Sequence, residues 1–327
     1  MKAILSIDGG GIRGVVPALV LAQLEEYVGM PVARMFDLIA GTSTGGILAL
    51  ALAKPAFDGQ PEYTAANLVS LYENYGRLIF QRPFWRRFRP LRLLFEEKYD
   101  ARGIEMVLDC YFGGCRLKSA LTNVLVTSYE IERRFPFFFR SNVAAQTASY
   151  DFPMKVVARA TSAAPTFFEP VKIEAEGPTG YYALVDGGLY ANNPALCAVV
   201  EARALFGDEP LLVVSLGTGA LTRPICYEDA RHWGLARWAK PVLDIAFDGV
   251  SSTVDYQLQR MLRQEAGQPP MYYRFQPVLD PGLTDMDDTS PRNMRRLKLL
   301  TEAMLRDRHG EMISLAAALL GAKGGRV

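Results

Sequence analysis

Short runs of apolar residues, each bounded by glycine or polar turn residues, alternate with longer segments whose apolar residues recur every three or four positions. The short runs, which indicate strands, are residues 3–7, 36–40, 123–127, 182–185 and 211–216. The segments with helical spacing are residues 15–28, 44–54, 155–161 and 194–206. Strands that alternate with helices in this way are typical of an α/β fold, in which helices cover the faces of a mostly parallel sheet.

One pattern continues through most of the chain. Its 327 residues exceed the roughly 100–200 of a typical domain, but single α/β enzymes reach this length. The sequence has no internal repeat, low-complexity tract or evident linker. We therefore expect one domain over residues 1–327, with a motif-bearing core at residues 1–219 and a mainly helical covering at residues 220–327.

Composition and charge exclude several classes of function. Half of the residues are apolar and 22% are charged, which indicates a large buried core. The formal net charge is only +1, so no whole-molecule field attracts nucleic acid, and no nucleic-acid partner is expected. Four cysteines without a CxxC pair, together with two histidines, argue against a Cys/His metal site.

The apolar stretches are too short to cross a bilayer. The N-terminus enters a strand-like run at once, without the features of a signal peptide. Residues 45–53 and residues 312–320 form the notable apolar stretches, and both are shorter than the roughly 20 residues of a membrane span. We therefore expect a cytoplasmic protein that associates with membranes only peripherally.

Gly41-Thr42-Ser43-Thr44-Gly45 is a G-x-S-x-G sequence between a predicted strand and a predicted helix. In that setting the serine lies on a sharp turn with its side chain above the sheet, and the flanking glycines let neighbouring chains approach. The N-terminus of the following helix favours negative charge there. A glycine-rich structural turn would have the same composition, but the strand-turn-helix setting favours Ser43 as a nucleophile.

A serine hydroxyl needs a positioned base at neutral pH. The only histidines, His232 and His309, lie in charged stretches typical of solvated helix faces, unless either folds back onto the site. Otherwise a carboxylate must take the proton. Asp186 is the leading candidate because it ends a strand-like run and precedes Gly187 and Gly188, although Asp-Gly is also a common turn. Because an ordinary aspartate pKa is near ~3.9, burial and strong oxyanion stabilisation must compensate.

The loop Asp8-Gly9-Gly10-Gly11-Ile12-Arg13-Gly14 joins the first strand to a helix. Three successive glycines present backbone N–H groups that suit an oxyanion. Arg13 either holds this loop and adds positive charge, or is a surface residue of the first helical turn. The stretch also fits the G-x-G-x-x-G pattern of dinucleotide sites, but these need an acid at the end of a second strand about 20 residues on. Glu25 and Glu26 lie in a helical pattern instead, so no nucleotide is expected.

The glycine loop, the serine turn and Asp186-Gly187-Gly188 stand in this order in one chain, and together they closely resemble the patatin-like phospholipase family. Residues 158–165 also look like the family segment that precedes the aspartate strand. The resemblance covers residues 1–219 and implies a three-layer α/β/α fold with a mostly parallel sheet.

The resemblance also implies a chemistry. Ser43 and Asp186 would form a catalytic dyad without histidine, and Gly9, Gly10 and Gly11 would form the oxyanion hole. The expected activity is calcium-independent hydrolysis of fatty-acyl esters in membrane phospholipid or lysophospholipid, through an acyl-serine intermediate and without metal or organic cofactor. The alternative is a noncatalytic lipid-binding or storage protein on the same fold.

Residues 80–95 hold five arginines and no acids, with an aromatic residue or leucine at most other positions. Arginine interleaved with Trp, Phe and Leu suits the boundary between lipid head groups and acyl chains. Trp85, Arg86, Arg87 and Arg89 are therefore predicted to contact the membrane. The alternative is that the apolar side chains pack onto the core while the arginines are solvated.

Asp285-Met286-Asp287-Asp288 is the one acidic run that suggests a calcium site. It lacks the carboxylate spacing of an EF-hand loop. We expect it instead to form a turn before a helix that begins near Ser290.

Overall fold

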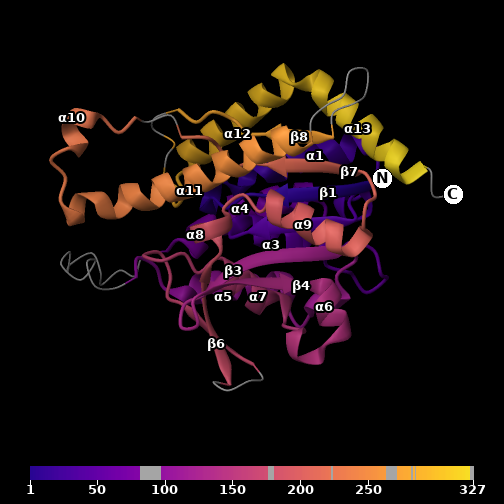
Figure 1. Cartoon of the computed structure of the whole chain (residues 1–327), viewed down its shortest axis with the longest axis horizontal. Coiled ribbons are helices and arrows are strands. Elements are labelled where there is room, and N and C mark those ends of the chain that lie inside the picture. The colour runs from indigo at the N-terminus through magenta and orange to yellow at the C-terminus, as the bar shows by residue number, and fades with distance from the viewer. Residues whose placement is uncertain are drawn as a thin grey trace.

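The computed structural model describes residues 1–81, 97–175, 180–221, 224–262, 271–280, 283 and 285–324 (Figure 1). Within these residues eight strands form one mixed sheet in the order β5-β6-β3-β2-β1-β7-β8, with β4 also paired to β3. The strands are β1 (Lys2–Ile7), β2 (Leu38–Thr42), β3 (Asn123–Glu130), β4 (Phe135–Arg140), β5 (Val171–Glu174), β6 (Tyr181–Asp186), β7 (Leu211–Leu216) and β8 (Tyr272–Phe275). The path β3-β2-β1-β7-β8 is parallel throughout, which confirms the mostly parallel sheet.

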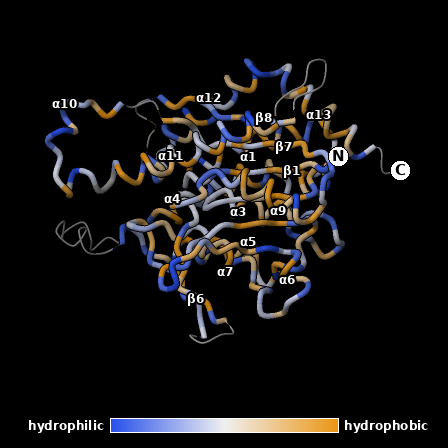
Figure 2. Tube along the Cα trace, viewed as in Figure 1, coloured by the Kyte–Doolittle hydropathy of each residue, from blue (hydrophilic) through white to orange (hydrophobic). Residues whose placement is uncertain are grey.

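Helices lie on both faces of this sheet. The helices are α1 (Val15–Val28), α2 (Val32–Met35), α3 (Thr44–Ala53), α4 (Ala65–Ile79), α5 (Ala101–Phe112), α6 (Ser141–Gln146), α7 (Met154–Thr161), α8 (Gly188–Ala191), α9 (Ala195–Phe206), α10 (Tyr227–Ala230), α11 (Leu235–Met261), α12 (Pro291–Asp307) and α13 (His309–Gly324). Alternate residues of β1 separate the two layers: Leu5 packs with α1 and α3, whereas Ile4 packs with α9. The sheet interior is largely apolar (Figure 2). The three-layer α/β/α fold is therefore confirmed.

The pairing of β3 explains why the serine and aspartate motifs meet. Thr42, the last residue of β2, lies opposite Thr127 in a parallel pair. Asp186, the last residue of β6, lies opposite Ser128 in an antiparallel pair. Because β4 occupies the other edge of β3 over residues 125–130, β2 and β6 share one edge. They run in opposite directions along it, and their last residues pair with adjacent residues of β3. Ser43, which follows Thr42, therefore lies beside Asp186.

Each predicted strand and helix lies close to one in the structure, but several helices, among them α4 and α5, and three strands were not predicted from the hydrophobic pattern. β4 contains Pro136 and pairs only with β3 among the described strands, and β5 has only four residues. β8 also has four residues, with Arg274 at its centre. Residues 220–327 are mainly helical in α11, α12 and α13, but they also extend the central sheet through β8.

Helix α11 is the longest of the described helices, and its first turns project with α10 beyond the rest of the body (Figure 1). Among the described residues, no helix has both the length and the apolar character required to cross a bilayer.

Candidate active site

Ser43 lies at a strained turn between β2 and α3. Its backbone has φ 55° and ψ −124°, a conformation that non-glycine residues rarely adopt and that functional sites often contain. The turn also brings two backbone segments into contact, because a Cβ atom at Gly41 would lie 2.1 Å from the carbonyl oxygen of Gly45. A Cβ atom at Gly45 would lie 2.1 Å from the carbonyl oxygen of Ile7, so close packing requires both glycines of the motif. The serine side chain faces a cavity.

Three threonines hold this turn in place. The Ser43 amide donates to Thr161 Oγ1 at 2.9 Å, and the Thr161 hydroxyl donates to the Thr127 carbonyl at 2.6 Å. The Thr42 hydroxyl donates to the Ala191 carbonyl at 2.6 Å and lies 2.7 Å from Thr127 Oγ1. The sequence did not single out these threonines, because they come from β2, β3 and α7 and meet only in the folded chain.

Asp186 is buried beside Ser43, whose hydroxyl hydrogen-bonds its carboxylate. The Gly188 amide donates to Asp186 Oδ1 at 2.8 Å, and so fixes the orientation of the carboxylate. Burial raises the pKa of Asp186 from 3.8 to about 7, against the opposing effect of these two hydrogen bonds. Gly187 packs against Thr127, where a Cβ atom would lie 2.2 Å from Oγ1. A carboxylate with this pKa is a much stronger base near neutral pH than an ordinary aspartate.

Neither histidine lines the cavity that contains Ser43 and Asp186. His309 begins α13, where its Nδ1 lies 3.1 Å from the hydroxyl of Tyr27. His232 is exposed between α10 and α11 and accepts a hydrogen bond from Arg231. Asp186 therefore contacts the serine without a histidine between them.

The three glycines after β1 have different positions. The Gly9 amide donates to the Asn192 carbonyl at 3.0 Å, so it is already engaged. Gly9 instead allows close packing, since a Cβ atom there would lie 3.3 Å from the Cβ of Ser43. Gly10 and Gly11 line the cavity, and within the described part of the chain neither amide donates to a protein acceptor. These two amides are the candidate oxyanion donors of the loop.

An ion pair anchors the start of the glycine loop. Arg274 of β8 binds both carboxylate oxygens of Asp8, at 2.9 and 2.6 Å, and also donates to Ser215 Oγ at 2.7 Å. Burial raises the pKa of Asp8, and the charge of Arg274 opposes this rise. Sequence patterns missed Arg274, although a charged residue inside an apolar strand was the signal that a buried partner exists.

Arg13 and Thr218 hydrogen-bond carbonyl oxygens of the glycine loop. Arg13 is buried and its Nε donates to the Gly10 carbonyl at 3.4 Å, which excludes the surface position considered from sequence. Burial lowers the pKa of Arg13 to about 10, so the side chain remains charged at neutral pH. The Thr218 hydroxyl donates to the Gly9 carbonyl at 2.6 Å. Both contacts use carbonyl oxygens of the loop, so they do not engage the Gly10 and Gly11 amides.

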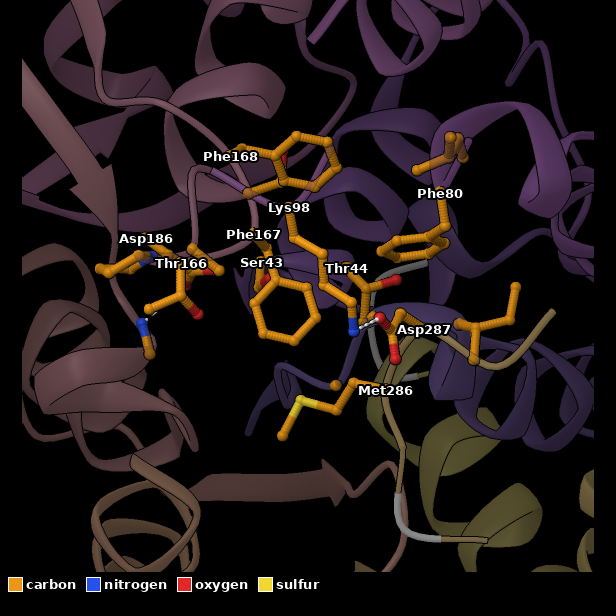
Figure 3. Close-up of a pocket in the computed structure, with 18 of the residues that line it drawn as sticks. Ser43, Thr44, Phe80, Lys98, Thr166, Phe167, Phe168, Asp186, Met286 and Asp287 are labelled. Carbon is orange, nitrogen blue, oxygen red and sulfur yellow. Dashed lines mark hydrogen bonds and ion pairs between the residues drawn. The ribbon is translucent and has the colours of Figure 1, made fainter. Parts of the chain in front are cut away.

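A cavity of about 750 Å³ opens in front of the dyad. Phe167, Phe168 and Met286 line it together with Ser43 (Figure 3). Eight further apolar side chains also line it: Ile12, Ile47, Leu71, Ile79, Phe80, Ile104, Leu243 and Phe247. This volume and lining suit a small-molecule site with a long apolar portion. The cavity can therefore hold a fatty-acyl chain with its ester at Ser43.

Polar contacts at the cavity involve the acidic run. Asp287 accepts hydrogen bonds from Lys98 and from the Tyr99 hydroxyl. Asp288 accepts from the Ser290 amide at 2.9 Å, just before α12 begins. The run thus forms the turn before α12 that the sequence favours.

Trp85, Arg86, Arg87 and Arg89 lie outside the described residues. Phe80, the first residue of the arginine-rich stretch, and Glu97, two residues after its end, both line the cavity.

The chain is similar in sequence to known proteins over most of its length. The sequence profile of the family described as patatin-like phospholipase matches residues 5–199, which include the glycine loop, the serine turn and Asp186. Patatin-like protein 4 of Arabidopsis thaliana is 31% identical over 93% of this chain and 83% of its own length. Probable inactive patatin-3-Kuras 1 of Solanum tuberosum is 31% identical over 94% of this chain and 87% of its own length. The structure of VipD from Legionella pneumophila aligns with a TM-score of 0.38 and 12% identity over 93% of this chain and 67% of that chain, too distant to support an argument.

Proposed function

Because the chain belongs to the patatin-like phospholipase family, we propose that it hydrolyses fatty-acyl esters of phospholipids or lysophospholipids through a covalent acyl-Ser43 intermediate. The observation that carries this proposal is the hydrogen bond from the Ser43 hydroxyl to the buried carboxylate of Asp186, at the wall of an apolar cavity. A nucleophile and a base whose pKa is near neutral pH thus lie together at a cavity with space for an acyl chain.

In the acylation step, Ser43 Oγ attacks the ester carbonyl while Asp186 takes the hydroxyl proton. The negative charge that develops on the carbonyl oxygen is stabilised by the Gly10 and Gly11 amides and by the N-terminus of α3, which begins at Thr44. The ester bond to the glycerol oxygen then breaks, and Asp186 returns the proton to that oxygen.

In the deacylation step, Asp186 takes a proton from water, and the resulting hydroxide attacks the acyl-serine carbonyl. The same amides stabilise the second oxyanion. When it collapses, the acyl–Oγ bond breaks, Asp186 returns its proton to Ser43 Oγ, and the fatty acid is released. A pKa of about 7 lets Asp186 act as both base and acid near neutral pH. These steps use only groups of the chain, so we propose that hydrolysis is independent of calcium and persists in EDTA.

The alternative is a noncatalytic lipid-binding or storage protein, and one similar protein is named a probable inactive patatin. The hydrogen-bonded Ser43 and Asp186 favour the hydrolase. Purified protein should release fatty acid from mixed phospholipid vesicles, and Ser43→Ala should not. Wild-type protein that binds these vesicles but releases no fatty acid would support the noncatalytic alternative.

We also propose peripheral contact with membranes through the arginine-rich segment. The support is its sequence: five arginines alternate with aromatic and aliphatic residues over residues 80–95. Anionic lipid contributes about 1 kcal/mol for each basic residue near the surface.

A further inference from the structure

Helix α11 carries apolar side chains on the side that faces solvent. Leu235, Val242 and Ile245 are 94%, 51% and 48% exposed. With Trp238 they recur at three- or four-residue intervals, and therefore share one side of the helix. The solvent-facing side of a helix is normally polar. A contiguous apolar stripe on a helix that projects from the body (Figure 1) indicates a surface that contacts something other than water.

Another side of the same helix forms part of the catalytic cavity. Leu243 and Phe247, one turn apart, line the cavity that contains the dyad. Further along α11, Ser251 Oγ accepts a hydrogen bond from Asn192 Nδ2 at 3.0 Å, which ties the helix to the segment that follows the catalytic aspartate. One continuous helix thus links the exposed stripe to the site of reaction.

Aromatic residues accompany the stripe. Trp233 and Trp238 pack edge to face with 5.3 Å between ring centroids, and both are half-exposed. Tyr227 on α10 is 74% exposed. Tryptophan and tyrosine are enriched where a bilayer meets water, since each combines an apolar ring with a polar group. By contrast, Val200 on α9 and Leu299 on α12 each stand alone among the exposed large apolar side chains of their helices, as is usual for globular proteins.

We propose that this surface, defined by Tyr227, Trp233, Leu235, Val242 and Ile245, docks on a lipid bilayer. The inference rests on the proposed function, because the substrate of a glycerolipid hydrolase resides in a bilayer. A helix of this kind lies in the interface with its apolar face buried by about 5–10 Å. The cavity wall then lies about one helix diameter, ~10 Å, from the acyl chains. An acyl chain can move along α11 into the cavity without crossing bulk water.

The test removes the stripe and preserves the helix. Leu235→Gln, Val242→Gln and Ile245→Gln are combined, because glutamine is a good helix former. Vesicle flotation is measured in the Ser43→Ala protein with pure phosphatidylcholine vesicles, which carry no net charge to attract arginine. We expect binding to weaken about tenfold or more. A matched variant with Val200→Gln, Leu299→Gln and Ile313→Gln, all exposed on other helices, should bind as the parent does.

A second readout places the tryptophans. The chain has three tryptophans, so Trp85→Phe leaves Trp233 and Trp238 as the only tryptophans, whose fluorescence is excited selectively. Phosphatidylcholine brominated on its acyl chains should quench this pair, and the quenching should disappear when the three glutamines are introduced. In the catalytically intact protein, hydrolysis in vesicles should fall with binding, whereas hydrolysis of a soluble short-chain ester should not change.

Unchanged vesicle binding by the triple variant would overturn the proposal. If light scattering shows a dimer that the variant loses while vesicle binding persists, the stripe is instead an interface between two copies. A melting temperature lowered by several degrees would mean that the chain itself covers the stripe. Because vesicle binding is measured without catalysis, an inactive wild-type enzyme would refute the proposed function and leave this result standing.

Discussion

Replacing Asp186 with asparagine is expected to abolish hydrolysis and yet stabilise the fold above neutral pH. The native carboxylate is buried, and burial raises its pKa from 3.8 to about 7. Asparagine has the same shape, can still accept the Gly188 amide, and carries no charge to desolvate. The variant therefore loses the base and also removes a buried charge that the folded state tolerates poorly.

The size and pH dependence of this stabilisation follow from proton linkage. Between pH 3.8 and about 7 the folded protein holds a proton on Asp186 that the unfolded chain has lost. The unfolding free energy contributed by this group is therefore lost as pH rises through that window. At about 1.36 kcal/mol for each pH unit, the loss at pH 8 is roughly 4 kcal/mol. For a chain of 327 residues, with an unfolding entropy of about 2.1 cal/mol/K per residue, this corresponds to about 6 °C in melting temperature.

The assay is thermal unfolding of wild type and Asp186→Asn at pH 8 and at pH 4.5, with the exposed Asp208→Asn as the control. The melting temperature of Asp186→Asn should exceed that of wild type by about 6 °C at pH 8, and most of this difference should vanish at pH 4.5. Asp208→Asn should show no such divergence. Equal melting temperatures at pH 8, or a less stable Asp186→Asn, would refute the idea that burial of the ionised carboxylate destabilises the folded protein.

Three further variants test two contacts that support the dyad and its glycine loop, and the arginine-rich segment. Thr161→Val removes the acceptor of the Ser43 amide. It should lower stability by about 1–3 kcal/mol and kcat by up to about a hundredfold, with little change in KM. An unaltered kcat would show that the turn keeps its conformation without this hydrogen bond. Arg274→Met leaves Asp8 buried without its partner and should lower the unfolding free energy by about 3–5 kcal/mol in denaturant titration. Adding Asp8→Asn to this variant should restore part of the lost stability, and no restoration would argue against the ion pair. Arg86, Arg87 and Arg89 changed together to Glu should weaken binding to anionic vesicles about a hundredfold or more without affecting a soluble ester, whereas equal losses on both substrates would indicate a structural role.

Local sequence predicts the strand-turn-helix around Ser43 and the strand that ends at Asp186, because backbone geometry and hydrophobic spacing act over a few residues. Their meeting on β3 is not a local property. It depends on β6 running antiparallel and ending opposite Ser128, next to the partner of Thr42. Its place after a strand made Asp186 the leading candidate for the base, and the resemblance to a known family implied its pairing with the serine.

The supporting contacts were beyond local patterns for the same reason. Arg274 lies 266 residues from Asp8 along the chain, and Thr161 lies 118 residues from Ser43. The apolar stripe of α11 was also missed. Its spacing is ordinary for a core-facing helix, and only the fold shows that this side is exposed. Three successive glycines predicted three equivalent donors, whereas the carbonyl of Asn192 engages the first of them.

The most direct test of the catalytic assignment is reaction with an alkyl fluorophosphonate, in which the nucleophile displaces fluoride and becomes covalently phosphonylated. Mass spectrometry of the digested protein should place one adduct per chain on the peptide that contains Ser43, and hydrolysis of lipid should fall in proportion to labelling. Ser43→Ala should remain unlabelled, and Asp186→Asn should react far more slowly. An adduct on another residue that accounts for the loss of activity, or full lipid hydrolysis by Ser43→Ala, would contradict the account.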